Sequence, residues 1–146
     1  MNQSKMKMIK RKKIKSLNFI RLLIAVFLPL TVFIVSRQGW AALASRYRHR
    51  GPVPAARMGV VTGAINTTNY KNSLLVRYNG EGLYLRPVFI FRLFHPPLFI
   101  PWAEIGTAEE QSAVFGLWKS FPVGEPPVAM ITLPEQAFER MRAAVR

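Results

Sequence analysis

The chain begins with one long run of apolar positions. Residues 22–36 contain no charged side chain, and the five residues before them extend the run to residues 17–36. A helix of about 20 residues crosses the ~30 Å hydrocarbon layer of a bilayer. Arg21 lies near the start of this run, where a long cationic side chain reaches the headgroups. The pattern predicts a basic tail over residues 1–16 and a transmembrane helix over residues 17–36.

Two other interpretations of the apolar run stay open. The first is a cleaved signal peptide, because the Ala-Leu-Ala sequence at residues 42–44 forms a small-x-small site after a basic and an apolar region. That site ends eight residues beyond Ser36, farther than an ordinary cleavage region extends. The second is a buried core helix, which the adjoining cationic cluster disfavours. Cleavage by signal peptidase would release a periplasmic or secreted domain.

A short amphipathic segment follows the predicted span. Trp40, Leu43 and Tyr47 recur at the i, i+3 and i+7 spacing of one helical face, with arginines on the other faces. One interpretation is a helix that lies along the headgroups with its aromatic side chains in the interface. The other is a helix that packs on the domain. A linker containing Gly and Pro completes the juxtamembrane segment, residues 37–57. The residues expected at the membrane interface are Arg21, Arg37, Trp40 and Tyr47.

From residue 58 onward the apolar positions form short runs separated by turn residues. The Asn79-Gly80 pair predicts a tight hairpin, and the segment after Pro134 has one apolar face, which predicts a helix. The strands expected from the pattern cover residues 58–65, 73–78, 83–91, 98–102, 113–118 and 128–133. The predicted fold class is mainly β (α+β): one N-terminal transmembrane helix, then a small antiparallel barrel or sandwich over residues 58–146, closed by a C-terminal amphipathic helix.

The positive charge of the chain is concentrated around the apolar run. The net charge is +14, and twelve of the twenty-one Lys and Arg residues lie in residues 1–50, which contain no acidic residue. The other nine, set against seven Glu residues, leave residues 51–146 with a charge of only +2. Attraction to anionic lipid, worth ~1 kcal/mol for each residue near the surface, accounts for such flanking charge. Because no aromatic residues interleave with the basic tail, a nucleic-acid partner is not expected.

The flanking charges also predict an orientation. Eight Lys and Arg residues precede Leu22, and five follow Ser36 within about twenty residues. This difference favours a cytoplasmic N-terminus and a periplasmic or extracytoplasmic domain, in a single-pass protein of the inner (cytoplasmic) membrane.

Few residues are available for catalysis. The chain has no Cys and no Asp, and its two histidines, His49 and His95, lie far apart in sequence. A zinc site normally needs three or four ligands from His, Cys and carboxylate side chains. The Gly80-Glu81-Gly82 turn lacks the Lys and the helix start of a phosphate-binding loop. We therefore expect no catalytic, cofactor-binding or metal site, and a hydrolase is a remote alternative.

The segment from Phe89 to Trp102 is rich in aromatic residues and interrupted by three prolines. Consecutive prolines cannot donate the hydrogen bonds of a strand, so the chain is expected to leave the sheet there. Alternate aromatic residues could fill the core. We expect at least one of the two phenylalanines beside the proline pair to contact lipid or a partner protein instead. The candidate contact surface consists of Phe94, His95, Pro96, Pro97 and Phe99.

Several short motifs carry a resemblance to a known family. Residues 82–85 (Gly-Leu-Tyr-Leu), 95–98 (His-Pro-Pro-Leu) and 100–105 (Ile-Pro-Trp-Ala-Glu-Ile), together with the terminal helix, resemble the pleckstrin-homology-like (PH-like) domains of small bacterial membrane-anchored proteins. The resemblance implies a β barrel with a C-terminal helix. It also implies a membrane-anchored, non-enzymatic binding or assembly module, with the lipid bilayer and a protein or lipid near the membrane as its partners.

Overall fold

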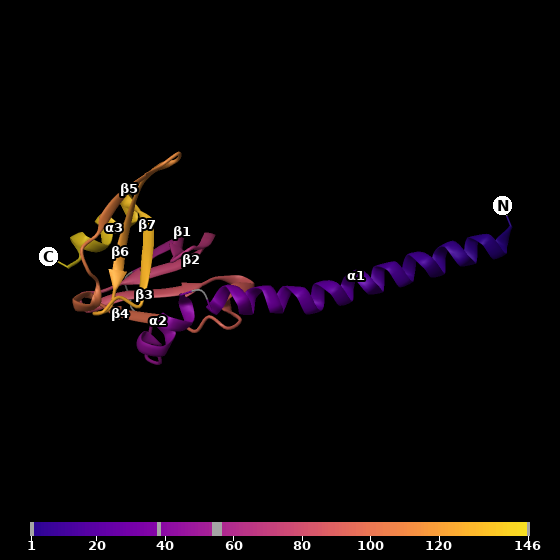
Figure 1. Cartoon of the computed structure of the whole chain (residues 1–146), viewed down its shortest axis with the longest axis horizontal. Coiled ribbons are helices and arrows are strands. Elements are labelled where there is room, and N and C mark those ends of the chain that lie inside the picture. Colours follow the sequence, from indigo (N-terminus) through magenta and orange to yellow (C-terminus); the bar gives the residue numbers. More distant parts are fainter. Residues whose placement is uncertain (1, 38, 54–56, 146) are drawn as a thin grey trace.

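The N-terminal helix dominates the shape of the molecule. In the computed structural model, which describes residues 2–37, 39–53 and 57–145, helix α1 runs over Gln3–Arg37. It leaves the domain as one long rod (Figure 1), about 50 Å in length at 1.5 Å per residue. The basic tail and the apolar run therefore share one continuous helix.

The apolar side chains of α1 between residues 17 and 30 do not pack against the domain. Phe19, Leu22 and Phe27 are exposed, and their apolar neighbours along the helix are exposed as well. Within the described residues, α1 is the helix that is long and apolar enough to cross a membrane. A helix in the core of a soluble protein would bury such side chains. The helix therefore fits a membrane anchor or a signal sequence, and it is not a core helix of the domain.

The domain is built on one antiparallel sheet of seven strands that curls into a half-barrel (Figure 1). Its strand order is β4-β3-β2-β1-β7-β6-β5. The strands are β1 (Arg57–Ile65), β2 (Thr68–Tyr78), β3 (Gly82–Pro87), β4 (Leu98–Pro101), β5 (Glu109–Ala113), β6 (Gly116–Val123) and β7 (Ala129–Pro134). Short 3-10 turns, η1 (Phe89–Arg92) and η2 (Trp102–Glu104), follow β3 and β4.

The hairpin predicted at Asn79-Gly80 is confirmed, since Tyr78 pairs with Leu83 across it. The side chain of Asn79 closes the turn: its Oδ1 accepts hydrogen bonds from the amides of Glu81 and Gly82 at 2.9 and 3.0 Å. The indole of Trp102 donates to the Asn79 carbonyl at 2.8 Å. The tryptophan of the Ile-Pro-Trp motif therefore has a structural role in holding this turn.

Two helices complete the core at opposite ends of the chain. Helix α3 (Glu135–Ala143) buries Ala137 and Met141 against the sheet, and its Phe138 ring lies 5.5 Å from the Phe121 ring of β6. Helix α2 (Trp40–Tyr47) buries Trp40, Leu43 and Tyr47 in the same core. The predicted mainly β fold with an apolar N-terminal helix and a C-terminal helix on the strands is confirmed.

The turn between α1 and α2 requires a glycine. Gly39 has a φ of 115°, a conformation that side chains rarely adopt. A Cβ atom there would also lie 2.8 Å from the side chain of Asn66, in the turn after β1. This close approach places the end of α1 directly beside the sheet.

Two of the expected strands are placed wrongly by the pattern. The expected strand 113–118 spans a hairpin turn, because β5 ends at Ala113 and β6 begins at Gly116. Apolar residues at the turn, Val114 and Phe115, mimic the run of a buried strand. β5 itself was missed because all five of its residues are exposed, so its sequence does not alternate. The expected strand 83–91 ends at Pro87, where the chain leaves the sheet.

Candidate membrane-contact site

The loop between β3 and β4, residues 88–97, lies beside the C-terminal part of α1 (Figure 1). The ring of Phe94 packs edge-on against the ring of Phe33 in α1, with 5.4 Å between their centres. Phe33 belongs to the charge-free run of residues 22–36. The loop therefore reaches back along the helix to a level where the helix is apolar.

Two large apolar side chains lie uncovered at the tip of this loop. Leu93 is 50% exposed and Phe94 is 51% exposed. Phe94 has a φ of 63°, a left-handed conformation that is uncommon for a residue other than glycine. The surrounding structure must hold the loop firmly to maintain this conformation.

A buried polar cluster holds the loop in place. His95 is 2% exposed, and its two ring nitrogens lie 3.0 Å from the Leu93 carbonyl (Nδ1) and 3.1 Å from the Tyr70 hydroxyl (Nε2). The carbonyl can only accept a hydrogen bond, so Nδ1 carries the proton and Nε2 accepts from Tyr70. Trp40 donates from Nε1 to the Pro96 carbonyl at 2.9 Å. The cluster thus joins the loop to α2 and β2.

The cluster is uncharged at neutral pH. Burial lowers the pKa of His95 below its ordinary value, although the bond to the Leu93 carbonyl opposes this shift. Burial also raises the pKa of the Tyr70 hydroxyl well above its ordinary value. The Trp40 ring packs on both partners, at 5.2 Å from the His95 ring and 5.6 Å from the Tyr70 ring. Neutral, mutually bonded groups of this kind are suited to a structural role inside the domain.

The five residues expected to form the contact surface have different environments. Phe94 is exposed beside α1, whereas His95 is buried. The carbonyls of Pro96 and Pro97 accept hydrogen bonds from Trp40 and from the amide of His49. Phe99 is half-buried in β4, and its ring lies 5.6 Å from the His49 ring. The exposed residue beside Phe94 is Leu93, which the sequence pattern did not single out.

The residues expected at the membrane interface are also divided. Arg21 is exposed on α1, and the side chain of Arg37 lies outside the described part of the structure. An aromatic belt requires side chains on the surface. Trp40 and Tyr47 do not meet this requirement, because both side chains lie in the domain core. The second interpretation of this segment, a helix that packs on the domain, describes α2.

The hydroxyl of the buried Tyr47 side chain has a polar partner in the domain. Its hydroxyl donates to Oε2 of Glu104 at 2.8 Å, and Arg46 lies 3.5 Å from the same oxygen. Burial and the bond to Glu104 raise the pKa of the Tyr47 hydroxyl. Tyr47 therefore connects α2 to the turn after β4 and leaves no polar tip free to reach headgroups.

The described residues contain no group of three or more His, Cys, Asp or Glu side chains that could hold a metal ion. Both ring nitrogens of His95 are used in bonds within the protein, and His49 bonds to the Pro52 carbonyl at 2.9 Å. No protein-family model, curated protein or solved structure matches the chain. The geometry of the loop therefore carries the functional argument.

Proposed function

We propose that this protein is a single-pass inner-membrane protein whose PH-like domain is held against the bilayer surface as a non-enzymatic binding or assembly module. The observation that carries the proposal is the contact between Phe94 and Phe33. If α1 spans the bilayer, Phe33 lies in the apolar layer, and the loop tip that touches it lies at the same depth. The half-barrel and its C-terminal helix support the relation to PH-like domains.

The exposed side chains at the loop tip favour such a position. Fully burying one Leu or Phe side chain is worth ~1.5–3 kcal/mol. Leu93 and Phe94 are each about half exposed, so covering the remainder with lipid would contribute about 1.5–3 kcal/mol for the pair. This free energy would restrict the angle between the domain and the membrane. The binding surfaces of the domain would then face a defined direction.

The position of α2 in the core supports an anchor that is not cleaved. Cleavage after Ala44 would remove Trp40 and Leu43, both fully buried, and the bond from Trp40 to the loop. The released domain would lose two large parts of its core, at a cost of about 2–5 kcal/mol for each. Eight against five flanking cationic residues support a cytoplasmic N-terminus, with the domain on the other side.

Extraction of the full-length protein tests the anchor. A chain with tags at both ends should remain in the membrane pellet after carbonate treatment at high pH, and both tags should stay on one band of full length. This is expected because the apolar side chains of α1 between residues 17 and 30 are exposed along the helix and need the bilayer to cover them. A shorter, soluble band carrying only the C-terminal tag would overturn the proposal in favour of a released domain.

A further inference from the structure

The hairpin of β5 and β6 carries two apolar side chains that almost nothing in the protein covers. Val114 and Phe115 form its turn and are 92% and 93% exposed. The hairpin extends past the other strands of the sheet, on the side of the domain away from the axis of α1 (Figure 1). Turn positions ordinarily hold Gly, Asn, Asp or Ser. A pair of large apolar residues at such a tip is typical of a surface that contacts another molecule.

The strand beside this tip has a free edge. β5 is the last strand in the sheet order, and all five of its residues are exposed. The other edge of the sheet is covered, because Arg48 bridges to Leu98 of β4 and the His49 amide bonds to the Pro97 carbonyl. An uncovered edge presents unpaired amides and carbonyls to any strand that approaches it. In the described residues, β5 is the edge that is available for pairing.

We propose that β5 pairs with β5 of a second copy of this chain, antiparallel, around a two-fold axis that passes beside Gln111. Closed two-fold interfaces use the same patch on both copies, so the strand must be complementary to itself. Only every second residue of an edge strand directs its amide and carbonyl outward, and both members of a pair must do so together. The paired residue numbers must therefore have the same parity.

Charge and length select one register among those that remain. With Gln111 opposite itself, all five residues of β5 find a partner, and Glu109 faces Ala113 while Glu110 faces Ser112. A register centred on Glu110 would pair only three residues and place this carboxylate opposite its own copy. Like charges directly opposite each other destabilise a sheet. The sequence of β5 thus favours the register centred on Gln111.

The same register brings the exposed tip to an apolar groove. Beyond the paired strands, Val114 comes level with Ala108 of the second copy, and Phe115 comes level with Thr107 of the second copy. Thr107 and Ala108 line a groove of about 380 Å³ beside α3. Its apolar wall includes Ile105, Phe138 and Val145. A cavity of about 150 Å³ accepts a benzene ring, so the groove has room for Phe115.

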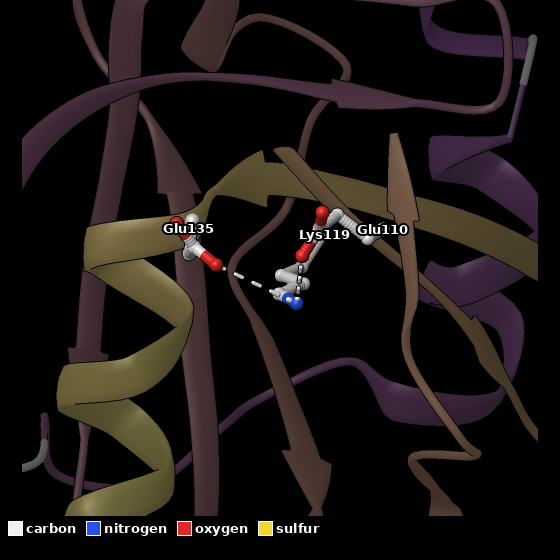
Figure 2. A network of polar contacts seen from close by, with 3 residues as sticks. All are labelled: Glu110, Lys119 and Glu135. Atoms are coloured by element: carbon white, nitrogen blue, oxygen red, sulfur yellow. Dashed lines mark hydrogen bonds and ion pairs between the residues drawn. The ribbon is translucent and has the colours of Figure 1, made fainter. Parts of the chain in front are cut away.

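A polar network fixes the base of the hairpin relative to this groove. Nζ of Lys119 in β6 lies 2.9 Å from Oε2 of Glu110 in β5 and 3.6 Å from Oε1 of Glu135 at the start of α3, as Figure 2 shows. The bond to Glu110 raises the pKa of Lys119, so its charge is retained at neutral pH. Strand β5 is thereby connected to α3, which forms the wall of the groove.

Disulfide cross-linking of the full-length protein in its membrane tests the register. The chain has no native cysteine. Opposed Cα atoms in an antiparallel ladder are ~4.5–5.5 Å apart, within the range of a disulfide. A Gln111→Cys variant should therefore form a covalent dimer on oxidation.

Glu109→Cys, on the same face of the same strand, is the matched control. Its copy lies ~13 Å away along the strand, so it should not dimerise alone but should link to a co-expressed Ala113→Cys chain. Equal dimer yields from Gln111→Cys and Glu109→Cys would overturn the proposal.

A second measurement tests the tip. Replacing Phe115 with Ala in the Gln111→Cys chain should weaken association by about tenfold or more, because an apolar contact is lost in both copies. Val60→Ala removes an exposed apolar side chain of β1 that belongs to neither surface, and it should leave the dimer yield unchanged. If Phe115→Ala has no effect, or if a probe at residue 115 is quenched by lipid, the tip does not enter the groove and the proposal fails. The contact between two copies does not involve the loop at residues 88–97. Failure of the membrane-contact proposal would therefore leave the proposed dimer unaffected.

Discussion

His95 is the residue on which the loop beside α1 most depends. It has almost no access to solvent, and its bonds to Tyr70 and to the Leu93 carbonyl determine which nitrogen carries the proton. A charged imidazole at this position would present a proton to the Tyr70 hydroxyl in place of a lone pair. Protonation should therefore loosen the loop while leaving the opposite end of the sheet intact.

The first prediction is a pH dependence that comes from this residue. The pKa of His95 is lowered in the folded state, whereas an unfolded His has a pKa of about 6.5. As the pH falls below that value, the unfolded state takes up the proton more readily, so the free energy of unfolding should decrease. Thermal melts of the full-length protein in detergent, between pH 7.5 and pH 5.5, measure this change.

Two variants separate His95 from other titrating groups. His95→Gln should flatten the pH dependence and lower the free energy of unfolding at pH 7.5 by about 1–3 kcal/mol, because the buried bonds of the ring are lost. His49→Gln removes the half-buried histidine and should keep the dependence. A dependence that survives in His95→Gln would assign it to a different group.

The sequence predicted this loop only in part. Two prolines in succession showed that the chain leaves the sheet after β3, and large aromatic residues showed that the loop carries apolar surface. The environment of each residue depends on α2, more than forty residues earlier in the chain. The Trp40 indole and the Tyr70 hydroxyl bury His95 and bond to the loop, and Leu93 and Phe94 stay exposed as its large apolar residues. No local pattern contains that contact.

Among the secondary-structure elements, α2 has the largest effect on the limits of the folded unit. It is only eight residues long, which is too short to be stable as an isolated helix in water. Its stability comes from the three side chains that it buries in the core. The folded unit therefore includes residues from Trp40 onward, although the apolar pattern of the sheet begins near residue 58.

Truncation tests this role of α2. A chain that begins at Gly39 retains Trp40, Leu43 and Tyr47 and should unfold in one cooperative transition with a mainly β circular dichroism spectrum. A chain that begins at Ser45 lacks Trp40 and Leu43 and should lose about 4 kcal/mol or more, a large part of the ~5–15 kcal/mol that stabilises a folded domain. Equal melting temperatures for the two fragments would show that α2 does not belong to the core.

The pattern of apolar residues located some elements of this domain and missed others. The helix over residues 40–47 was identified from its spacing, but its packing partner was open because aromatic residues suit both an interface and a core. The edge strand β5 was missed, since a strand exposed on both faces has no alternation. The turn at Val114 and Phe115 was predicted as part of a strand, because its consecutive apolar residues resemble the run of a buried strand.

At the scale of the whole molecule, the protein combines a long apolar helix with a half-barrel that has one covered and one open edge in its described part. The loop beside α1 and the hairpin tip are separate surfaces (Figure 1). We propose that the first contacts lipid and the second contacts another copy of the chain. The general plan followed from the sequence because a charge-free run and a change to short apolar runs are strong signals. The relation between the loop and α1 did not, because it depends on the tertiary fold.

The depth of the loop in the bilayer directly tests whether the domain lies against the membrane. A fluorophore sensitive to its environment can be attached to Leu93→Cys in the full-length protein, reconstituted into lipid vesicles. This substitution keeps the contact between Phe94 and Phe33. Glu81→Cys, at the opposite end of β3 from the loop, is the control. We predict blue-shifted emission at residue 93 that nitroxide-labelled lipids quench, with neither effect at residue 81. Emission at residue 93 that matches residue 81 and resists quenching would contradict it.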